Sequence, residues 1–137
     1  MLLLLALGCA GCSKFQTARE CGLFVGAIKA WKEQAPKPAA SAPVPSPAGA
    51  STESRVLADR YDALAQRIDD LHLDSSELLP RATRYQKLAR AAAAALRDVA
   101  AAVERGDAEG ARRRRVEFDD IASGEAPLVA DINAVCR

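Results

Sequence analysis

The sequence has few aromatic residues and a single histidine, His72. Phe, Trp and Tyr together make up 4% of the 137 residues, while valine and isoleucine are sparse and nowhere alternate with polar residues. Because a half-buried strand requires that alternation, nothing in the sequence predicts a β-sheet. No glutamate has a histidine three residues later, which excludes the paired Glu-x-x-His motifs of di-iron bundles.

Alanine is the most frequent residue and occupies 30 of the 137 positions. It has the highest helix propensity but contributes little apolar surface, so the apolar fraction of 50% overstates the size of the core. With 27% charged residues, the composition predicts an all-α fold in which alanine-rich helices pack closely. The net charge of +1 by itself favours neither nucleic acid nor a membrane as a partner.

Apolar residues recur at three- and four-residue spacings in four segments, which predicts four amphipathic helices. We expect helices over residues 18–34, 52–71 and 76–105, and a fourth that follows Asp107 and reaches the C-terminus. A kink or a short break is expected where the fourth apolar stripe is interrupted, at Ser123, Gly124 and Pro127.

The predicted helices begin at recognisable capping residues. Ser51 or Thr52 is expected to cap the second helix, and Asp107 the fourth. Asp74 and Glu77 have the spacing of a capping box before the third helix.

Residues 35–51 separate the first helix from the other three. This stretch, APKPAASAPVPSPAGAS, contains five prolines among alanines and serines. Proline lacks a backbone donor and fixes φ, so we expect an extended linker here rather than a packed element. Residues 52–137 then hold the remaining three helices of the bundle.

The last three helices are joined by short turns, so neighbours are expected to pack antiparallel. If the first helix completes an up-down-up-down four-helix bundle, its start lies beside the end of the fourth helix. Cys21 and Cys136 occupy those two ends. We therefore predict a Cys21–Cys136 disulfide, which closes a loop of about 115 residues and stabilises the small core by about 4–5 kcal/mol.

A second pair of cysteines, Cys9 and Cys12, lies in the stretch ALGCAGCSKF behind an apolar run. Covalent haem attachment requires histidine after the second cysteine, where this chain has Ser13. A thioredoxin-like dithiol requires a preceding strand, and a zinc site requires a second ligand pair that the sequence lacks. Residues 1–11 are also too short for a membrane span, which needs roughly 20 apolar residues.

The stretch resembles the signal peptide of bacterial lipoproteins, whose lipobox ends in small residues followed by cysteine. Ala10-Gly11-Cys12 matches the last three lipobox positions, and Ala6-Leu7-Gly8-Cys9 is the competing match. The resemblance implies removal of residues 1–11, acylation of Cys12 and a lipid-attached tether over residues 12–17. Ser13 resembles the outer-membrane sorting signal, which implies a location on the periplasmic face of the outer membrane.

The number of cysteines favours Cys12 over Cys9 as the acylated residue. If Cys12 is acylated and Cys9 is removed, the Cys21–Cys136 pair leaves no free thiol. Acylation of Cys9 would instead leave Cys12 as a free thiol in an oxidising compartment. The alternative to a signal peptide is the apolar N-terminus of a cytosolic helix.

Arg112, Arg113, Arg114 and Arg115 form a conspicuous basic run. They could contact anionic lipid headgroups, envelope polysaccharide phosphates or an acidic partner. The interpretation that we favour is a solvated helical turn balanced by neighbouring acids, with one arginine snorkelling from the packing seam. No aromatic platform accompanies the run, so no nucleic-acid partner is expected.

His72 is expected at the surface, in the turn between the second and third helices, and no metal or cofactor is expected. A catalytic role would require Asp119, Asp120 or Glu125 to converge on it. Glu125 is in phase with the apolar stripe of its helix. We expect Glu125 to hydrogen-bond the backbone groups freed by Pro127, and the alternative is a polar ligand bound in the bundle.

These features predict an exported, lipid-anchored helical bundle without catalytic machinery. We expect a non-catalytic binding or structural module of the cell envelope, held to the membrane by its N-terminal lipid and able to dock an envelope protein. One alternative is a carrier or sensor for a small apolar ligand, and another is an enzyme that uses carboxylates of the fourth helix. Trp31 is expected to fill the core, the alternative being an exposed partner contact.

Overall fold

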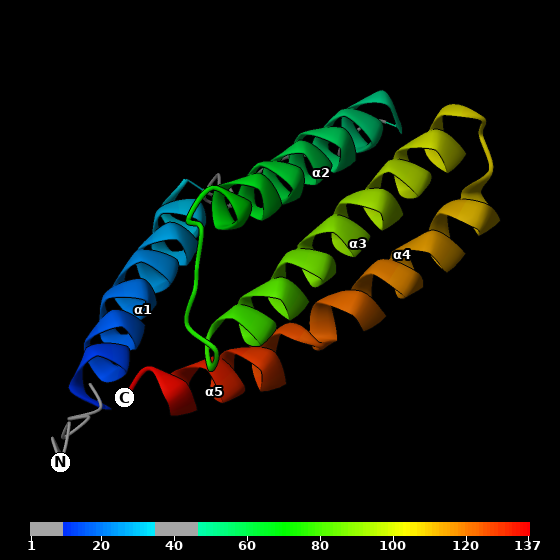
Figure 1. Ribbon diagram of the computed structural model, residues 1–137. Coiled ribbons are helices and arrows are strands. Elements are labelled where there is room, and N and C mark those ends of the chain that lie inside the picture. The colour runs from blue at the N-terminus through cyan, green and yellow to red at the C-terminus, as the bar shows by residue number, and fades with distance from the viewer. Residues whose placement is uncertain (1–9, 35–46) are drawn as a thin grey trace, which may run out of the picture.

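A computed structural model describes residues 10–34 and 47–137, with side chains described from Lys14 onward. The chain forms five helices in these ranges and no strand (Figure 1). They are α1 (Ala10–Glu33), α2 (Pro47–Asp69), α3 (Leu79–Glu104), α4 (Ala108–Ser123) and α5 (Glu125–Val135). The predicted all-α class is therefore confirmed, and the arrangement is compatible with a helical bundle.

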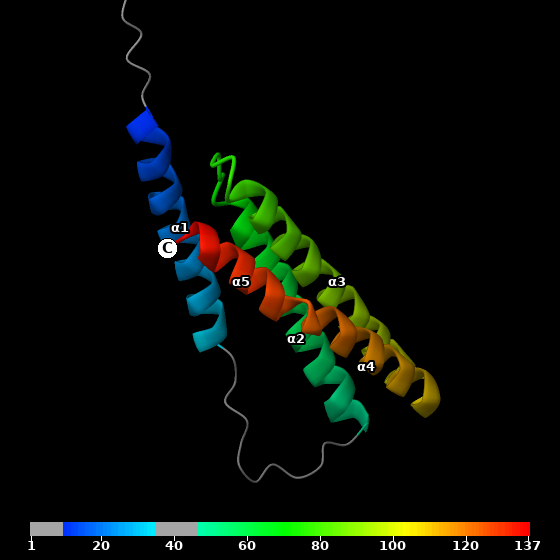
Figure 2. The same ribbon diagram turned by 90° about the horizontal axis from the view of Figure 1, so that it is seen from below.

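Helix α3 lies between α2 on one side and α4 and α5 on the other (Figures 1 and 2). Helices α4 and α5 follow one another along α3, while α1 covers only one end of the molecule, beside α2 and α5. We call this the disulfide end; it also contains the loop formed by residues 70–78. The far end holds the start of α2, the turn after α3 and the start of α4.

The buried side chains differ in size between the two ends. At the disulfide end, Phe24, Leu64, Leu78 and Tyr85 are each at most 2% exposed. Towards the far end the core is built largely from small side chains around Phe118, and its buried members include Ala58, Ala92, Ala93 and Ala95. These alanines let α2 and α4 approach α3 closely, because no bulk stands between the backbones.

The turn between α3 and α4 and the break between α4 and α5 lie where the sequence predicts them. Gly106 has a φ of +71°, a conformation that glycine adopts without steric cost. The Asp107 carboxylate then caps α4 by accepting a hydrogen bond from the Gly110 N–H at 2.7 Å. The predicted interruption is a short break at Gly124, between α4 and α5, with Pro127 in the first turn of α5.

Helix α1 begins at Ala10, so residues 12–17, expected to form a tether, are helical. Good helix formers such as Lys14, Gln16 and Ala18 explain the extension. The Gln16 amide also donates to the Glu20 carboxylate one turn later, at 3.0 Å.

Helix α2 begins at Pro47, so residues 47–51 belong to a helix and not to the linker. Proline is favoured at the first position of a helix, because the N–H that it lacks has no partner there. Ser51 is buried inside α2 instead of capping it, and its hydroxyl donates to the Glu104 carboxylate at 2.6 Å. The hydrogen bond from the Arg55 guanidinium, and after it the one from this Ser51 hydroxyl, lowers the pKa of Glu104 to about 2.

Residues 1–9 and 35–46, which include Cys9 and most of the expected linker, lie outside the described residues.

The third helix also differs at its start. The expected capping box at Asp74 and Glu77 is absent, because Leu78 is the N-cap residue of α3 and no side chain caps it. The Ser75 hydroxyl accepts a hydrogen bond from the Leu78 N–H at 3.2 Å in the turn before the helix. Pro80 lies in the first turn of α3.

The small side chains of α3 allow a direct test of close packing. Ala92 is fully buried, whereas Ala94 on the same helix is exposed. We expect Ala92→Leu to lower the free energy of unfolding by about 1–3 kcal/mol, because the added side chain has no space between α3 and its neighbours. The matched Ala94→Leu should change it by less than about 0.5 kcal/mol. Urea titrations of both variants measure this, and equal stabilities would show that the interface is loosely packed.

Candidate functional site

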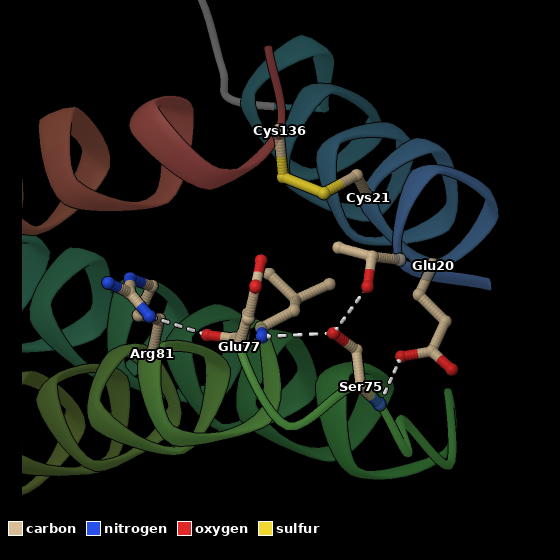
Figure 3. The surroundings of a disulfide bond; sticks show 8 residues. Glu20, Cys21, Ser75, Glu77, Arg81 and Cys136 are labelled. Atoms are coloured by element: carbon tan, nitrogen blue, oxygen red, sulfur yellow. Dashed lines mark hydrogen bonds between the residues drawn. A yellow bond between two sulfur atoms is a disulfide. The ribbon is translucent and has the colours of Figure 1, made fainter. Parts of the chain in front are cut away.

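The predicted disulfide between Cys21 and Cys136 is present and joins α1 to the residue that follows α5 (Figure 3). Its S–S distance is 2.02 Å and its Cα–Cα distance is 5.5 Å. Cys21 is 4% exposed and lies within the core of the disulfide end. The first and last helices of the chain are thus linked covalently across 115 residues of sequence.

The Glu20 carboxylate, next to Cys21, binds the loop between α2 and α3. It accepts a hydrogen bond from the backbone N–H group of Ser75 at 2.9 Å (Figure 3). It accepts another from the backbone N–H group of Asp74 at 3.2 Å. The Ser75 hydroxyl also lies 2.9 Å from that of Thr17, one turn before Glu20. Helix α1 therefore supplies the hydrogen-bond acceptor for two backbone N–H groups of this loop.

Glu20 is only 8% exposed, yet its hydrogen bonds favour the charged form. Burial raises the pKa of this carboxyl, but the bonds from the Ser75 N–H, the Gln16 amide and the Asp74 N–H, with the charge of Arg19, together outweigh burial. The pKa of Glu20 consequently lies below its usual value of 4.5. Glu20 was not recognised from the sequence, although its place on the buried face of α1, one turn before Phe24, was a signal.

Trp31 fixes the other end of α1 to α2. Its indole N–H donates to the Arg60 carbonyl at 3.0 Å, and the Arg60 guanidinium donates back to the Trp31 carbonyl at 2.9 Å. The guanidinium carbon lies 5.3 Å from the centre of the indole ring, and the Tyr61 ring packs at 5.0 Å. Trp31 is partly buried and packs against the core, as expected, and its hydrogen bonds to Arg60 also join α1 to α2.

Glu125 joins α5 to α3 and α1. Its carboxylate accepts a hydrogen bond from the Tyr85 hydroxyl at 2.7 Å and lies 3.3 Å from the Lys32 ammonium group. Burial and then this carboxylate raise the pKa of Tyr85, which remains a neutral donor. The contacts of Glu125 are therefore with these side chains, and not with backbone groups near Pro127 as expected, because a buried hydroxyl lies within reach.

The arginine run lies on the exposed surface of α4, on the half of the molecule away from the disulfide. Three of its members pair within the helix: Arg113 with Glu109 at 2.8 Å, Arg114 with Glu117 at 2.8 Å and Arg115 with Asp119 at 3.3 Å. Arg115 also lies over the Phe118 ring, 5.3 Å from its centre. Arg112 forms no ion pair with a described residue.

The residues of the enzyme hypothesis do not come together. His72 is exposed in the loop after α2, and its Nδ1 lies 2.7 Å from the Asp70 carbonyl. Asp119 pairs with Arg115, and Asp120 is exposed on α4. Within the described ranges, no group of three or more His, Cys, Asp or Glu side chains is arranged to hold a metal ion.

The larger hollows of the described surface are open grooves. One of about 410 Å³ lies at the disulfide end between Lys14, Glu77 and Arg137. Two more lie at the far end, one of about 390 Å³ beside Pro47, Val103 and Ala108 and one of about 340 Å³ over Leu57, Leu96 and other apolar side chains.

None of the helices in residues 10–34 and 47–137 has both the length and the apolar character of a membrane span. Comparisons with protein-family models, curated proteins and solved structures found no significant match to this chain.

The disulfide is expected to hold α1 in place. Because it closes a loop of 115 residues, Cys136→Ser should lower the free energy of unfolding by about 4–5 kcal/mol. Backbone amides of α1 should also lose protection from hydrogen exchange more than those of α3. Adding reductant to the wild type should reproduce both effects, whereas reductant should not affect the variant. Unchanged protection of α1 would mean that its non-covalent contacts suffice.

Glu20→Gln is expected to weaken the contact between α1 and the loop. A depressed carboxyl pKa stabilises the folded state above the unfolded value near 4.5, and this stabilisation is lost as pH falls through the folded value. The variant should lose about 1–3 kcal/mol at neutral pH, and its stability should fall less in acid. Denaturant titrations across pH measure both. Glu33→Gln, on an exposed part of α1, is the control, and an equal pH profile for Glu20→Gln and wild type would contradict the assignment.

Proposed function

We propose that this chain is an exported lipoprotein, acylated on Cys12, that acts as a non-catalytic binding or structural module of the cell envelope. The observation that carries the proposal is the Cys21–Cys136 disulfide. Such bonds persist in oxidising compartments, which lie outside the cytosol in most cells. The bond also accounts for two of the four cysteines, so the remaining pair is the one in the lipobox-like stretch.

The position of α1 supports an anchor close to the bundle. Cys12 belongs to the same helix as Cys21, because α1 is continuous from Ala10 to Glu33. Acyl groups on Cys12 would therefore hold the disulfide end near the membrane, on the periplasmic face of the outer membrane if Ser13 acts as the sorting signal. In this proposal α1, α2, α3 and the α4–α5 pair form an alanine-rich up-down-up-down bundle.

The polar contacts support binding or scaffolding more than catalysis. Glu20 and Glu125, the carboxylates nearest the core, each hold helices together through hydrogen bonds. The carrier alternative gains less support, because the larger hollows are open grooves and Glu125 is already engaged by Tyr85 and Lys32. A protein of the envelope is the partner that we propose, with no role for nucleic acid.

The intact mass of the protein extracted from the membranes of its native host tests this proposal. We expect a chain that starts at Cys12, carries acyl groups and gains the mass of two hydrogen atoms on reduction. Cys12→Ala should abolish acylation, while Cys9→Ala should leave it unchanged. An unprocessed chain with four free thiols would reject the proposal, and acylation at Cys9 would move the anchor.

A further inference from the structure

A smaller hollow of about 140 Å³ lies between α1 and α5. The disulfide between Cys21 and Cys136 joins these two helices, and they diverge from that bond in both views (Figures 1 and 2). Side chains of α1 and α5 line the hollow, together with Tyr85 of α3. Its shape therefore depends on the covalent bond that sets the position of α1 beside α5.

The apolar part of the lining belongs to the packed core. Phe24, Tyr85 and Ile132 are each at most 3% exposed. Ile28 and Val129 also line the hollow and are only partly buried, so they leave apolar surface uncovered there. An apolar cavity of about 150 Å³ holds a molecule the size of benzene. The hollow thus has space for one ring or for a short hydrocarbon chain.

The charged side chains that line the hollow are both cationic, Lys29 and Lys32 of α1. The Lys32 ammonium group lies 3.3 Å from the Glu125 carboxylate, whereas Lys29 is exposed and forms no ion pair with a described residue. Glu33, the next acid along α1, is exposed and does not pair with Lys29. From α5, the exposed Asn133 adds a side-chain amide, which can donate hydrogen bonds. None of the described residues that line the hollow is acidic, so a free cation and a neutral donor border an apolar surface.

We propose that this hollow binds a small apolar monocarboxylate, with its ring or short chain against Phe24, Val129 and Ile132 and its carboxylate at Lys29 and Asn133. Apolar walls with a few polar groups are typical of small-molecule sites. An ammonium group favours a carboxylate over a neutral acceptor, because charge-assisted hydrogen bonds are the stronger ones. The inference goes beyond the proposed function, since the site requires neither the acyl anchor nor an envelope partner. It also differs from a carrier, because the ligand lies at the surface between two helices and not inside the bundle.

Titrations of the isotope-labelled, disulfide-bonded chain, followed by amide chemical shifts, test the inference. Benzoate and hexanoate are the probes, because they distinguish a ring from an acyl chain, and benzyl alcohol and hexanol are their uncharged controls. We expect saturable shifts at the amides of Val25, Lys29 and Asn133 with at least one carboxylate, and a Kd on the order of 1 mM. The matching alcohol should bind about two- to fivefold more weakly, which is the effect of an exposed ion pair. High salt should reduce this difference, because it screens the charges.

Substitutions separate the polar part of the site from the apolar part. Lys29→Gln should weaken binding of the carboxylate about two- to fivefold and leave the alcohols unaffected. Lys87→Gln, the matched change at an exposed and unpaired lysine of α3, should alter neither. Val129→Phe should prevent binding of all four probes, because its ring fills the hollow. Val25→Phe makes the same test from α1 if the amide spectrum shows that Val129→Phe is unfolded.

Three results would overturn the inference. The first is the absence of saturable shifts at these amides in the wild type. The second is equal affinity for the acids and the alcohols, or unchanged carboxylate binding in Lys29→Gln. The third is a dimer in sedimentation that Val129→Phe dissociates, because a second copy of the chain would then occupy the hollow.

Discussion

The disulfide between Cys21 and Cys136 determines where α1 lies, and the other contacts of α1 depend on that position. In the described part of α1 only four side chains are buried, compared with eleven in α3. Burial on that scale gives α1 little hydrophobic stabilisation of its own. The covalent bond holds α1 beside α5. In that position Glu20 and Thr17 contact the loop between α2 and α3. Trp31, near the C-terminal end of α1, hydrogen-bonds α2.

The size of the core side chains explains why α1 covers only one end. At the disulfide end, large side chains such as Phe24, Tyr85 and Leu128 hold the helices apart, so a further helix is needed to close the core. At the far end, buried alanines let α2, α3 and α4 bury one another without a fourth partner. Ion pairs also join α2 to α3 at the surface there, including Arg55 with Glu104 and Arg97 with Asp62.

Periodicity was sufficient to predict the helices, the break near Gly124 and the pairing of Cys21 with Cys136, because each depends on spacing or on which helix ends meet. It did not predict the starts of α1 and α2, since Lys14, Gln16 and Pro47 are compatible with either a helix or a linker. The polar contacts were missed for a different reason. Glu20 binds residues 54 and 55 positions away, and Trp31 binds Arg60 across the proline-rich stretch. Such partners depend on the packed arrangement of helices, which no local pattern contains.

The distribution of charge, and not its sum, decides how far each cation is already neutralised by the fold. The net charge of +1 conceals the difference between cations that have an acidic partner and cations that have none among the described residues. On α4, three consecutive arginines each have an acidic partner three or four residues away, so their field is largely neutralised locally. Lys14, Lys29, Arg67, Lys87, Arg90 and Arg112, by contrast, form no ion pair with a described residue, and they are spread over α1, α2, α3 and α4. A basic run that is conspicuous in the sequence is therefore largely neutralised within its own helix, whereas single cations that are inconspicuous in the sequence are left unpaired by the fold.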